Sequence, residues 1–119
     1  MWYRSYSIDP DNKARMTDGA ISAMVRVPAD SSWFDGHFPG FAVLPGVAQL
    51  AIVAGVLEET LETRVRVTDV SRVRFKTAVL PDQVLEVRIT PRQNDPRAYG
   101  FRLLKDQELV CSGWLGVHA

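Results

Sequence analysis

Cysteine is nearly absent from this sequence, in which Cys111 is the only one among 119 residues. A single cysteine excludes a disulfide within the chain and leaves no cysteine-based zinc or redox motif. An excess of one charge is also missing, because 14 lysines and arginines balance 14 aspartates and glutamates. A neutral chain removes the usual electrostatic reason to expect nucleic acid or an anionic membrane as the main partner. No metal-binding or nucleotide-binding motif is present, so we expect chemistry without a bound metal or cofactor.

Long apolar runs are missing as well. The longest, at about residues 43–57, is interrupted by Pro45, Gly46, Gln49 and Gly55, and it falls short of the roughly 20 residues that cross a bilayer. The N-terminus lacks the basic segment followed by an apolar segment that a secretory signal has. We therefore expect a soluble, cytoplasmic protein with no membrane partner. The length suits one hydrophobic core, so we also expect a single domain over residues 1–119.

The first third of the sequence predicts an arm, a strand and a loop. Residues 1–18 are polar, carry an Asp-Pro-Asp-Asn turn signal and show no apolar period, so we expect an irregular N-terminal arm. The alternation of apolar residues between 21 and 27 predicts a half-buried strand. Residues 29–45 follow as a loop rich in proline, glycine, aspartate and aromatic side chains. Long loops of this kind are more often functional than accidental.

The rest of the sequence predicts one helix surrounded by strands. Residues 47–57 are apolar around the whole circumference of a helix, and Pro45 suits its first turn. We therefore expect a buried helix that meets solvent only near its C-terminal end. Four or so strands follow, with alternation around 65–76, 84–90, 99–103 and 109–115. This order predicts an α+β fold in which an antiparallel sheet curls around one long apolar helix.

The most informative segment is residues 37–50, His-Phe-Pro-Gly-Phe-Ala-Val-Leu-Pro-Gly-Val-Ala-Gln-Leu. It places the imidazole of His37 on a loop that leads through Pro45 and Gly46 into the predicted helix. The first N–H groups of a helix have no intrahelical acceptor and lie at its positive end, so they can bind a carbonyl oxygen that becomes negative. Histidine, with an ordinary pKa of about 6.5, can remove a proton next to such a carbonyl. A lone histidine is more often a structural or surface residue than a catalyst, so a catalytic role for His37 depends on the residues around it.

These neighbours resemble the motifs of the 3-hydroxyacyl-[acyl-carrier-protein] dehydratases. That family has His-Phe-Pro-Gly and then Pro-Gly-Val at the start of its central helix, and residues 37–40 and 45–47 repeat this order and spacing. Residues 74–76 (Arg-Phe-Lys) and 80–82 (Leu-Pro-Asp) are similar to two later stretches of the family, although the second lacks a glycine. Residues 44–50 are particularly similar to the small dehydratases of aryl polyene pathways.

The resemblance implies a hotdog fold, a homodimer with a substrate tunnel at each interface, and dehydration of an acyl thioester on an acyl carrier protein. In such a site His37 would take the C2 proton, and the N–H of Gly46 would bind the thioester carbonyl. The partner's helix would normally supply a glutamate or aspartate fourteen residues after its own histidine, and here that position is Ala51. Four apolar side chains are candidates to line the acyl tunnel: Phe38, Phe41, Leu44 and Val47.

The alanine at position 51 leaves three interpretations open. A positioned acid or base typically contributes about 10² to 10⁴ in rate, so His37 acting first as base and then as acid would give a slow enzyme. Another group could replace the carboxylate: we consider Gln49, otherwise a buried amide that fixes the loop, and Asp35, which more simply orients the loop. The chain could instead pair with an acid-bearing paralogue, so that His37 and the partner's carboxylate complete one site. A binding subunit without chemistry and a hotdog thioesterase are the remaining alternatives.

Three cations and two aromatic residues complete the candidates. Arg72, Arg74 and Lys76 alternate along one predicted strand face and could meet the acidic helix and phosphate-bearing arm of an acyl carrier protein. The alternative is that they form the solvent face of an edge strand. Trp33 and Phe34 precede the histidine, and we expect them to pack over the tunnel or the dimer seam.

Overall fold

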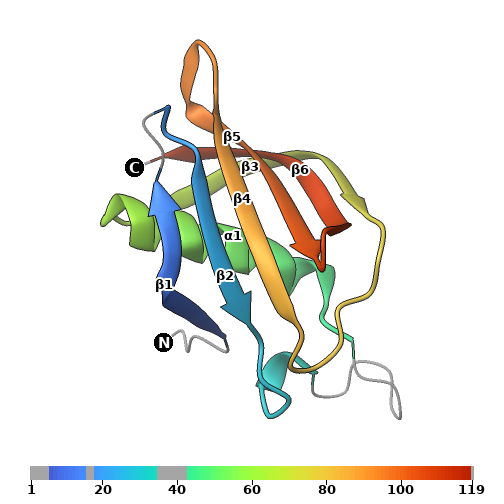
Figure 1. Cartoon of the computed structure of the whole chain (residues 1–119). Helices are drawn as coiled ribbons and strands as arrows, with labels where there is room; N and C mark the ends of the chain where they lie inside the picture. The colour runs from blue at the N-terminus through green and yellow to red at the C-terminus, as the bar shows by residue number, and fades with distance from the viewer. Residues whose placement is uncertain (1–5, 16–17, 35–42, 119) are drawn as a thin grey trace.

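The computed structural model describes residues 6–15, 18–34 and 43–118. Its elements are β1 (Ser7–Arg15), β2 (Ile21–Arg26), the 3-10 turn η1 (Ser32–Phe34), α1 (Gly46–Leu61), β3 (Arg66–Phe75), β4 (Val84–Arg92), β5 (Asp95–Lys105) and β6 (Glu108–His118). The strands form one antiparallel sheet in the order β1-β2-β4-β5-β6-β3, which curves around α1 (Figure 1). The predicted hotdog fold is confirmed. No helix in these described ranges is long and apolar enough to span a bilayer.

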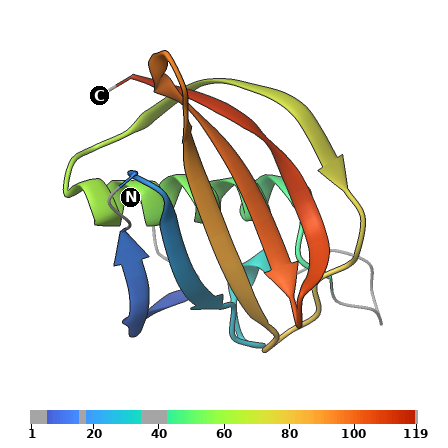
Figure 2. The same cartoon turned by 45° about the horizontal axis from the view of Figure 1, so that its top comes forward.

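Figure 2 shows that α1 lies across the inner face of the sheet, and the buried side chains of the helix and the strands form one core cluster. Strands β2 and β4 pair so that their buried side chains, such as Val25 and Leu85, are direct neighbours. From α1, Ile52, Val53 and Val56 pack into the same cluster with no exposed surface. Burial of one such side chain contributes about 1.5–3 kcal/mol. This layer therefore fixes the helix over the sheet.

The expectation of an irregular N-terminal arm is wrong for Ser7–Arg15, which form the edge strand β1. β1 pairs with β2, and its register shifts between Ile8 and Lys13, where the turn signal lies. Within that irregularity the Asp9 carboxylate accepts a hydrogen bond from the Asn12 side chain at 2.6 Å, which lowers the pKa of Asp9. An edge strand tolerates a proline at such an irregularity, and this one carries no apolar alternation, so the sequence pattern did not reveal it.

The N-terminal segment packs on α1 as well as on β2. Tyr6 occupies the space that a side chain at Gly55 would need, and its ring stacks on Trp33 with centroids 5.6 Å apart. The Lys13 ammonium lies 3.2 Å from a carboxylate oxygen of Glu59. β1 and the residue before it therefore cover the C-terminal half of the helix, where glycine permits the close approach.

One side of α1 is not covered by the sheet. Val47 is 76% exposed, and Leu50, Ala51 and Ala54 are only partly buried. The expectation that this helix meets solvent only near its C-terminal end is therefore wrong. The sheet covers one side, and a helix that is apolar all round needs a second cover. We call the side that carries these four residues the open face of α1.

Strand β3 is the second edge of the sheet, and within the described chain it pairs only with β6. Its register shifts twice, between Val67 and Asp69 and between Ser71 and Arg74. Three of its large apolar side chains are exposed: Val67 by 36%, Val70 by 40% and Phe75 by 52%. A free strand edge with exposed apolar side chains is typical of a surface that pairs with another chain.

Candidate active site

The candidate site lies where α1 begins. Pro45 is the N-cap residue, with φ −61° and ψ 150°, and it makes no side-chain capping bond. Its carbonyl oxygen accepts the N–H groups of Ala48 at 3.1 Å and Gln49 at 3.2 Å. The N–H groups of Gly46 and Val47 precede these bonds and lie at the positive end of the helix dipole. Two donors on a largely apolar surface are therefore available to an oxygen that gains negative charge.

The segment before the helix is held by the core. The Leu44 N–H donates to the Val79 carbonyl oxygen at 2.8 Å, and Leu44 is only 4% exposed. The Gln49 side chain is equally buried, and its Nε2 makes a long hydrogen bond of 3.4 Å to the Leu44 carbonyl oxygen. Gln49 Oε1 has no partner among the residues that the structure describes. These contacts support the role of Gln49 as a loop-fixing amide and place Leu44 in the core cluster.

Ala51 lies on the open face of α1. It follows Val47 by four residues, so the two side chains are one above the other on the same side of the helix. Gln49 points into the core instead, as its 4% exposure indicates, and it cannot occupy the place of a carboxylate at position 51. The geometry therefore disfavours Gln49 as a substitute for the missing acid.

The two glutamates of α1 serve the far end of the helix. Glu58 lies two turns beyond Ala51 on the same side, and its Oε1 accepts the Val65 N–H at 2.9 Å. Glu59 is paired with Lys13. Both carboxylates hold the chain around the helix C-terminus, away from Gly46.

Phe75, which sequence analysis did not single out, lies against Gly46. Three of its ring carbons are 2.7–3.1 Å from the point where a Cβ on Gly46 would be. The signal that could have found it is the Arg-Phe-Lys stretch, in which one large apolar residue stands between two cations. The Phe75 ring therefore lies beside the N–H group of Gly46 that the candidate site uses as a donor.

Other predicted residues fall into two groups. Four lie outside the described ranges, and their roles stay predictions: Asp35, His37, Phe38 and Phe41. The two aromatic residues before them take part in packing within the chain. Trp33 stacks on Tyr6, and Phe34 is 7% exposed and part of the core cluster. The structure therefore gives both side chains a packing role inside one subunit.

The three predicted carrier-binding cations are exposed but do not follow one regular strand face. Arg72 lies at the second register shift of β3 and has φ 53°. Arg74 pairs with Ser112 beyond that shift, and Lys76 follows the last residue of the strand. In the described part of the chain none of the three is in an ion pair. The expected regular alternation is interrupted, and the predicted docking role stays untested by this geometry.

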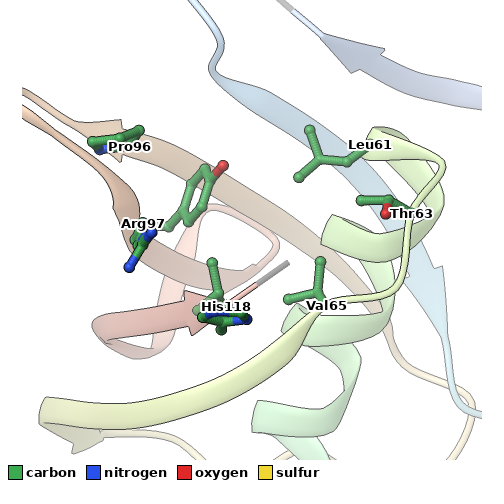
Figure 3. A pocket seen from close by; sticks show the side chains of 8 residues that line it. Leu61, Thr63, Val65, Pro96, Arg97 and His118 are labelled. Carbon is green, nitrogen blue, oxygen red and sulfur yellow. The ribbon is translucent and has the colours of Figure 1, made fainter.

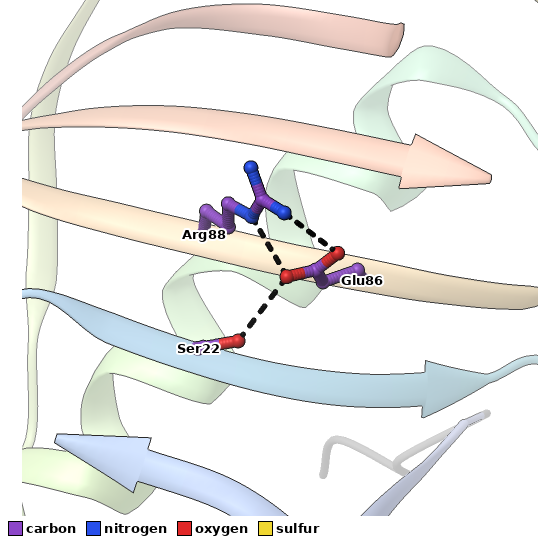
Figure 4. Close-up of polar contacts among 3 residues, drawn as sticks. All are labelled: Ser22, Glu86 and Arg88. Atoms are coloured by element: carbon purple, nitrogen blue, oxygen red, sulfur yellow. Dashed lines mark hydrogen bonds and ion pairs between the residues drawn. The ribbon is translucent and has the colours of Figure 1, made fainter. Parts of the chain in front are cut away.

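A further arginine extends this positive surface across the outer face of the sheet. Arg102 is paired with Ser112, the neighbour of Arg74, and on its other side with Arg88. Figure 4 shows that the Arg88 guanidinium is held by Glu86, at 2.7 and 3.2 Å. This contact raises the pKa of Arg88 and offsets its charge. Arg102, which only the strand register brings next to Arg74, is exposed and has no such partner within the described ranges.

The model of the ApeI-like family, described as ApeI dehydratase, matches residues 12–114. The chain belongs to the ApeI-like dehydratase family. It is also 33% identical over 114 residues to 3-hydroxyacyl-[acyl-carrier-protein] dehydratase FabZ from Streptococcus equi subsp. zooepidemicus, covering 88% of this chain and 81% of that protein. FabZ from Streptococcus mutans is 32% identical with the same coverage. The resemblance inferred from the motifs is confirmed, and it places the chain among enzymes that eliminate water, the hydro-lyases.

Solved structures agree with the fold of this ApeI-like family member. A chain of the dehydratase heterocomplex ApeI:P from Xenorhabdus doucetiae has a TM-score of 0.81 and 21% identity, covering 95% of this chain and 99% of that chain. A hypothetical thioesterase with coenzyme A from Streptococcus pneumoniae has a TM-score of 0.66 and 16% identity, covering 97% and 85%. Dehydratase and thioesterase thus share the architecture, so the chemistry must be argued from the site.

A hollow at the opposite end of α1 is separate from the candidate site of this ApeI-like dehydratase (Figure 3). It has a volume of about 210 Å³, and the residues that line it include Leu61, Val65, Tyr99 and His118. Because α1 has 16 residues, roughly 22 Å of helix lies between this hollow and Gly46. It therefore cannot contribute side chains to a reaction at the helix start.

Thiol and metal chemistry find no support in the described part of this family member. Cys111 has no exposed surface, and burial raises its pKa to about 12. Its thiol is therefore protonated at neutral pH and is not a nucleophile. No group of three or more histidine, cysteine, aspartate or glutamate side chains in the described ranges could hold a metal ion.

Proposed function

We propose that this ApeI-like dehydratase removes water from 3-hydroxyacyl thioesters carried by an acyl carrier protein. The observation that supports the proposal is the uncapped start of α1 at Gly46, in a family member related to FabZ enzymes of that activity. The elimination breaks the C2–H and C3–O bonds, forms the C2–C3 double bond and releases one water. Its difficult step is the negative charge that develops on the thioester oxygen when the C2 proton leaves.

Each residue in the proposed mechanism has one task. His37 takes the C2 proton, and the Gly46 N–H donates to the thioester oxygen while it is negative. The C3 hydroxyl then leaves with a proton as water. In a homodimer of this chain, the imidazolium of His37 returns the proton it has taken. In a heterodimer with an acid-bearing paralogue, the partner's carboxylic acid supplies it, because Ala51 has no proton to give.

The first test separates dehydration from thioester hydrolysis. We expect the purified protein to convert 3-hydroxybutyryl carrier protein to the crotonyl form, with the loss of one water from the intact carrier-bound mass. A dehydratase leaves the thioester in place, since no step attacks the carbonyl carbon. Mass spectrometry of the carrier reads both products. Release of the free carrier without an enoyl form would support a thioesterase and contradict the proposal.

We also propose that a second hotdog chain covers the open face of α1 and the free edge of β3. Both surfaces are apolar and exposed, as Val47, Val67 and Val70 show, and β3 has unpaired backbone groups along one edge. The structural neighbour from Xenorhabdus doucetiae is a heterocomplex of two kinds of chain. A homodimer would contain two sites without a carboxylate, and a heterodimer one complete site. The mass of the complex purified from the native host distinguishes the two.

The interface is tested by a charge on the free strand edge. We expect Val70→Lys to convert the dimer to monomer and to lower turnover at least tenfold, because a buried unpaired ammonium is costly. Light scattering coupled to gel filtration measures the mass. Val84→Lys is the matched control, since Val84 is similarly exposed, at 46%, but lies at the start of β4. A Val70→Lys protein that stays dimeric would rule out this edge as the interface.

The exposed cations of the sheet are proposed to bind the carrier protein. Arg74 and Arg102 are neighbours across β6, through Ser112, and Arg72 and Lys76 flank Arg74 along the chain. Uncompensated arginines suit the phosphate of a pantetheine arm and an acidic helix. Arg88 adds little, because Glu86 offsets its charge.

A further inference from the structure

Phe75 is fixed in position more firmly than an exposed residue at a strand end would normally be. It pairs with the buried Cys111 on β6. The next two residues are tied to the same strand: the N–H groups of Lys76 and Thr77 donate to the Val110 carbonyl oxygen at 2.8 and 3.3 Å. The Thr77 hydroxyl also bonds to the Leu109 carbonyl at 3.3 Å. The backbone that carries the ring is therefore held against β6 at Phe75 and at the two residues that follow it.

The Phe75 ring occupies the space that any side chain at position 46 would need. A Cβ at position 46 would lie 2.7 Å from Phe75 Cζ and 3.0 Å from Cε1. Gly46 is in an ordinary helical conformation and is not among the residues with positive φ, so backbone strain does not explain the glycine. The ring explains it, because the two groups are in direct contact. Phe75 therefore forms a wall beside the first peptide of α1.

The other side of the ring is open. Phe75 is 52% exposed, and the neighbouring Val47 is 76% exposed. A thioester whose oxygen accepts the Gly46 N–H would lie at the first residue of α1, the residue that the ring contacts. An aromatic ring in that place leaves little room for a substituent on C2.

We propose that Phe75 contacts the substrate beside C2 and makes the enzyme selective for thioesters without a C2 substituent. This inference rests on the proposed dehydratase function, since it uses the Gly46 N–H as the carbonyl site. The expected selectivity against a C2 methyl group is the usual effect of one methyl group in a well-packed pocket, which changes kcat/KM by about 10- to 200-fold. Phe75 sets which substrate fits and takes no part in proton transfer.

The test compares two substrates that differ by one methyl group. For 3-hydroxybutyryl and 2-methyl-3-hydroxybutyryl carrier protein, we expect Phe75→Ala to raise the ratio of kcat/KM, methylated over unmethylated, at least about tenfold. Phe75→Leu, which keeps most of the apolar volume, should give a smaller rise and guards against misfolding. Val84→Ala, at an exposed apolar position at the start of β4 and outside the proposed interface, should leave the ratio unchanged. An unchanged ratio in Phe75→Ala would overturn the proposal, as would an equal loss for both substrates together with dissociation of the dimer.

A binding measurement keeps this inference separate from the proposed reaction. Calorimetry of butyryl-pantetheine and 2-methylbutyryl-pantetheine gives the same comparison without turnover, because neither compound has a double bond to hydrate or a hydroxyl to eliminate. If the wild-type protein dehydrates neither substrate, the proposed function fails, and the binding ratio still decides the role of Phe75. Weak binding of the methylated compound that recovers at least about tenfold in Phe75→Ala supports the inference. Equal binding of both compounds by the wild-type protein, or binding of neither, contradicts it.

Discussion

Ala51→Glu is expected to raise the dehydration turnover of the protein purified on its own by about 10²- to 10⁴-fold, the usual contribution of a positioned acid or base. Position 51 lies on the open face of α1, four residues after Val47 and one turn and a half from Gly46. A glutamate there would point into the partner's site, where the departing C3 hydroxyl needs a proton. Steady-state kinetics with 3-hydroxybutyryl carrier protein measures the gain, which should be in kcat and not in KM, because the acid acts in the transition state.

Ala54→Glu is the matched control for this gain. It adds the same carboxylate to the same open face, one turn further from Gly46, where it cannot reach the hydroxyl. Ala51→Gln tests whether a proton is required, since an amide of similar size has none to give. A gain of equal size in either control would show that the carboxylate at 51 acts through stability or assembly. A wild-type protein that already turns over as fast as Ala51→Glu would place the acid elsewhere.

His37→Gln is expected to lower kcat by about 10²- to 10⁴-fold while KM changes little. Glutamine keeps a polar side chain of similar size but cannot take the C2 proton at neutral pH. Exchange of the C2 proton with deuterated solvent, followed by mass spectrometry, measures proton removal apart from the loss of water. We expect both rates to fall together, because one imidazole begins the reaction.

The control for the histidine is His118→Gln, which removes the only other histidine of the sequence at the end of β6. It should retain full turnover, because His118 borders the hollow at the opposite end of α1. Should His37→Gln keep wild-type exchange and turnover, the proposed base would be wrong even though the family assignment stands.

The fold was predictable from the sequence in those strands where burial of one face makes apolar and polar residues alternate. Alternation of apolar residues in 21–27 and in 84–90 corresponds to β2 and β4, because one face of each strand packs on α1. The same rule missed β1, whose pairing depends on backbone hydrogen bonds and on an irregularity around Pro10. In β3, which the pattern predicted around residues 65–76, two register shifts interrupt the alternation. Edge strands with bulges carry little periodic signal, because neither face is packed throughout.

The candidate site was predictable from its motifs in part. The Pro-Gly step located the start of α1 at Gly46, since proline at a helix start followed by glycine is a local signal. The exposure of Val47 was not predictable, because an apolar residue in an apolar helix does not reveal which side the sheet leaves open. The contact between Phe75 and Gly46 joins residues 29 positions apart, which follows from the topology and from no local pattern.

The open face of α1 and the free edge of β3 also bear on the fate of the chain in the cell. A newly made subunit presents Val47, Val70 and Phe75 to water beside the edge of β3 that no other strand of the described chain pairs with. Such surfaces are recognised by chaperones and proteases in incomplete proteins and promote aggregation. If the proposed heterodimer forms, the steady-state abundance of this chain should therefore follow the supply of the acid-bearing chain. If this chain were made in excess over the acid-bearing chain, the excess should be degraded or should form inclusion bodies, and no pool of free subunits should accumulate.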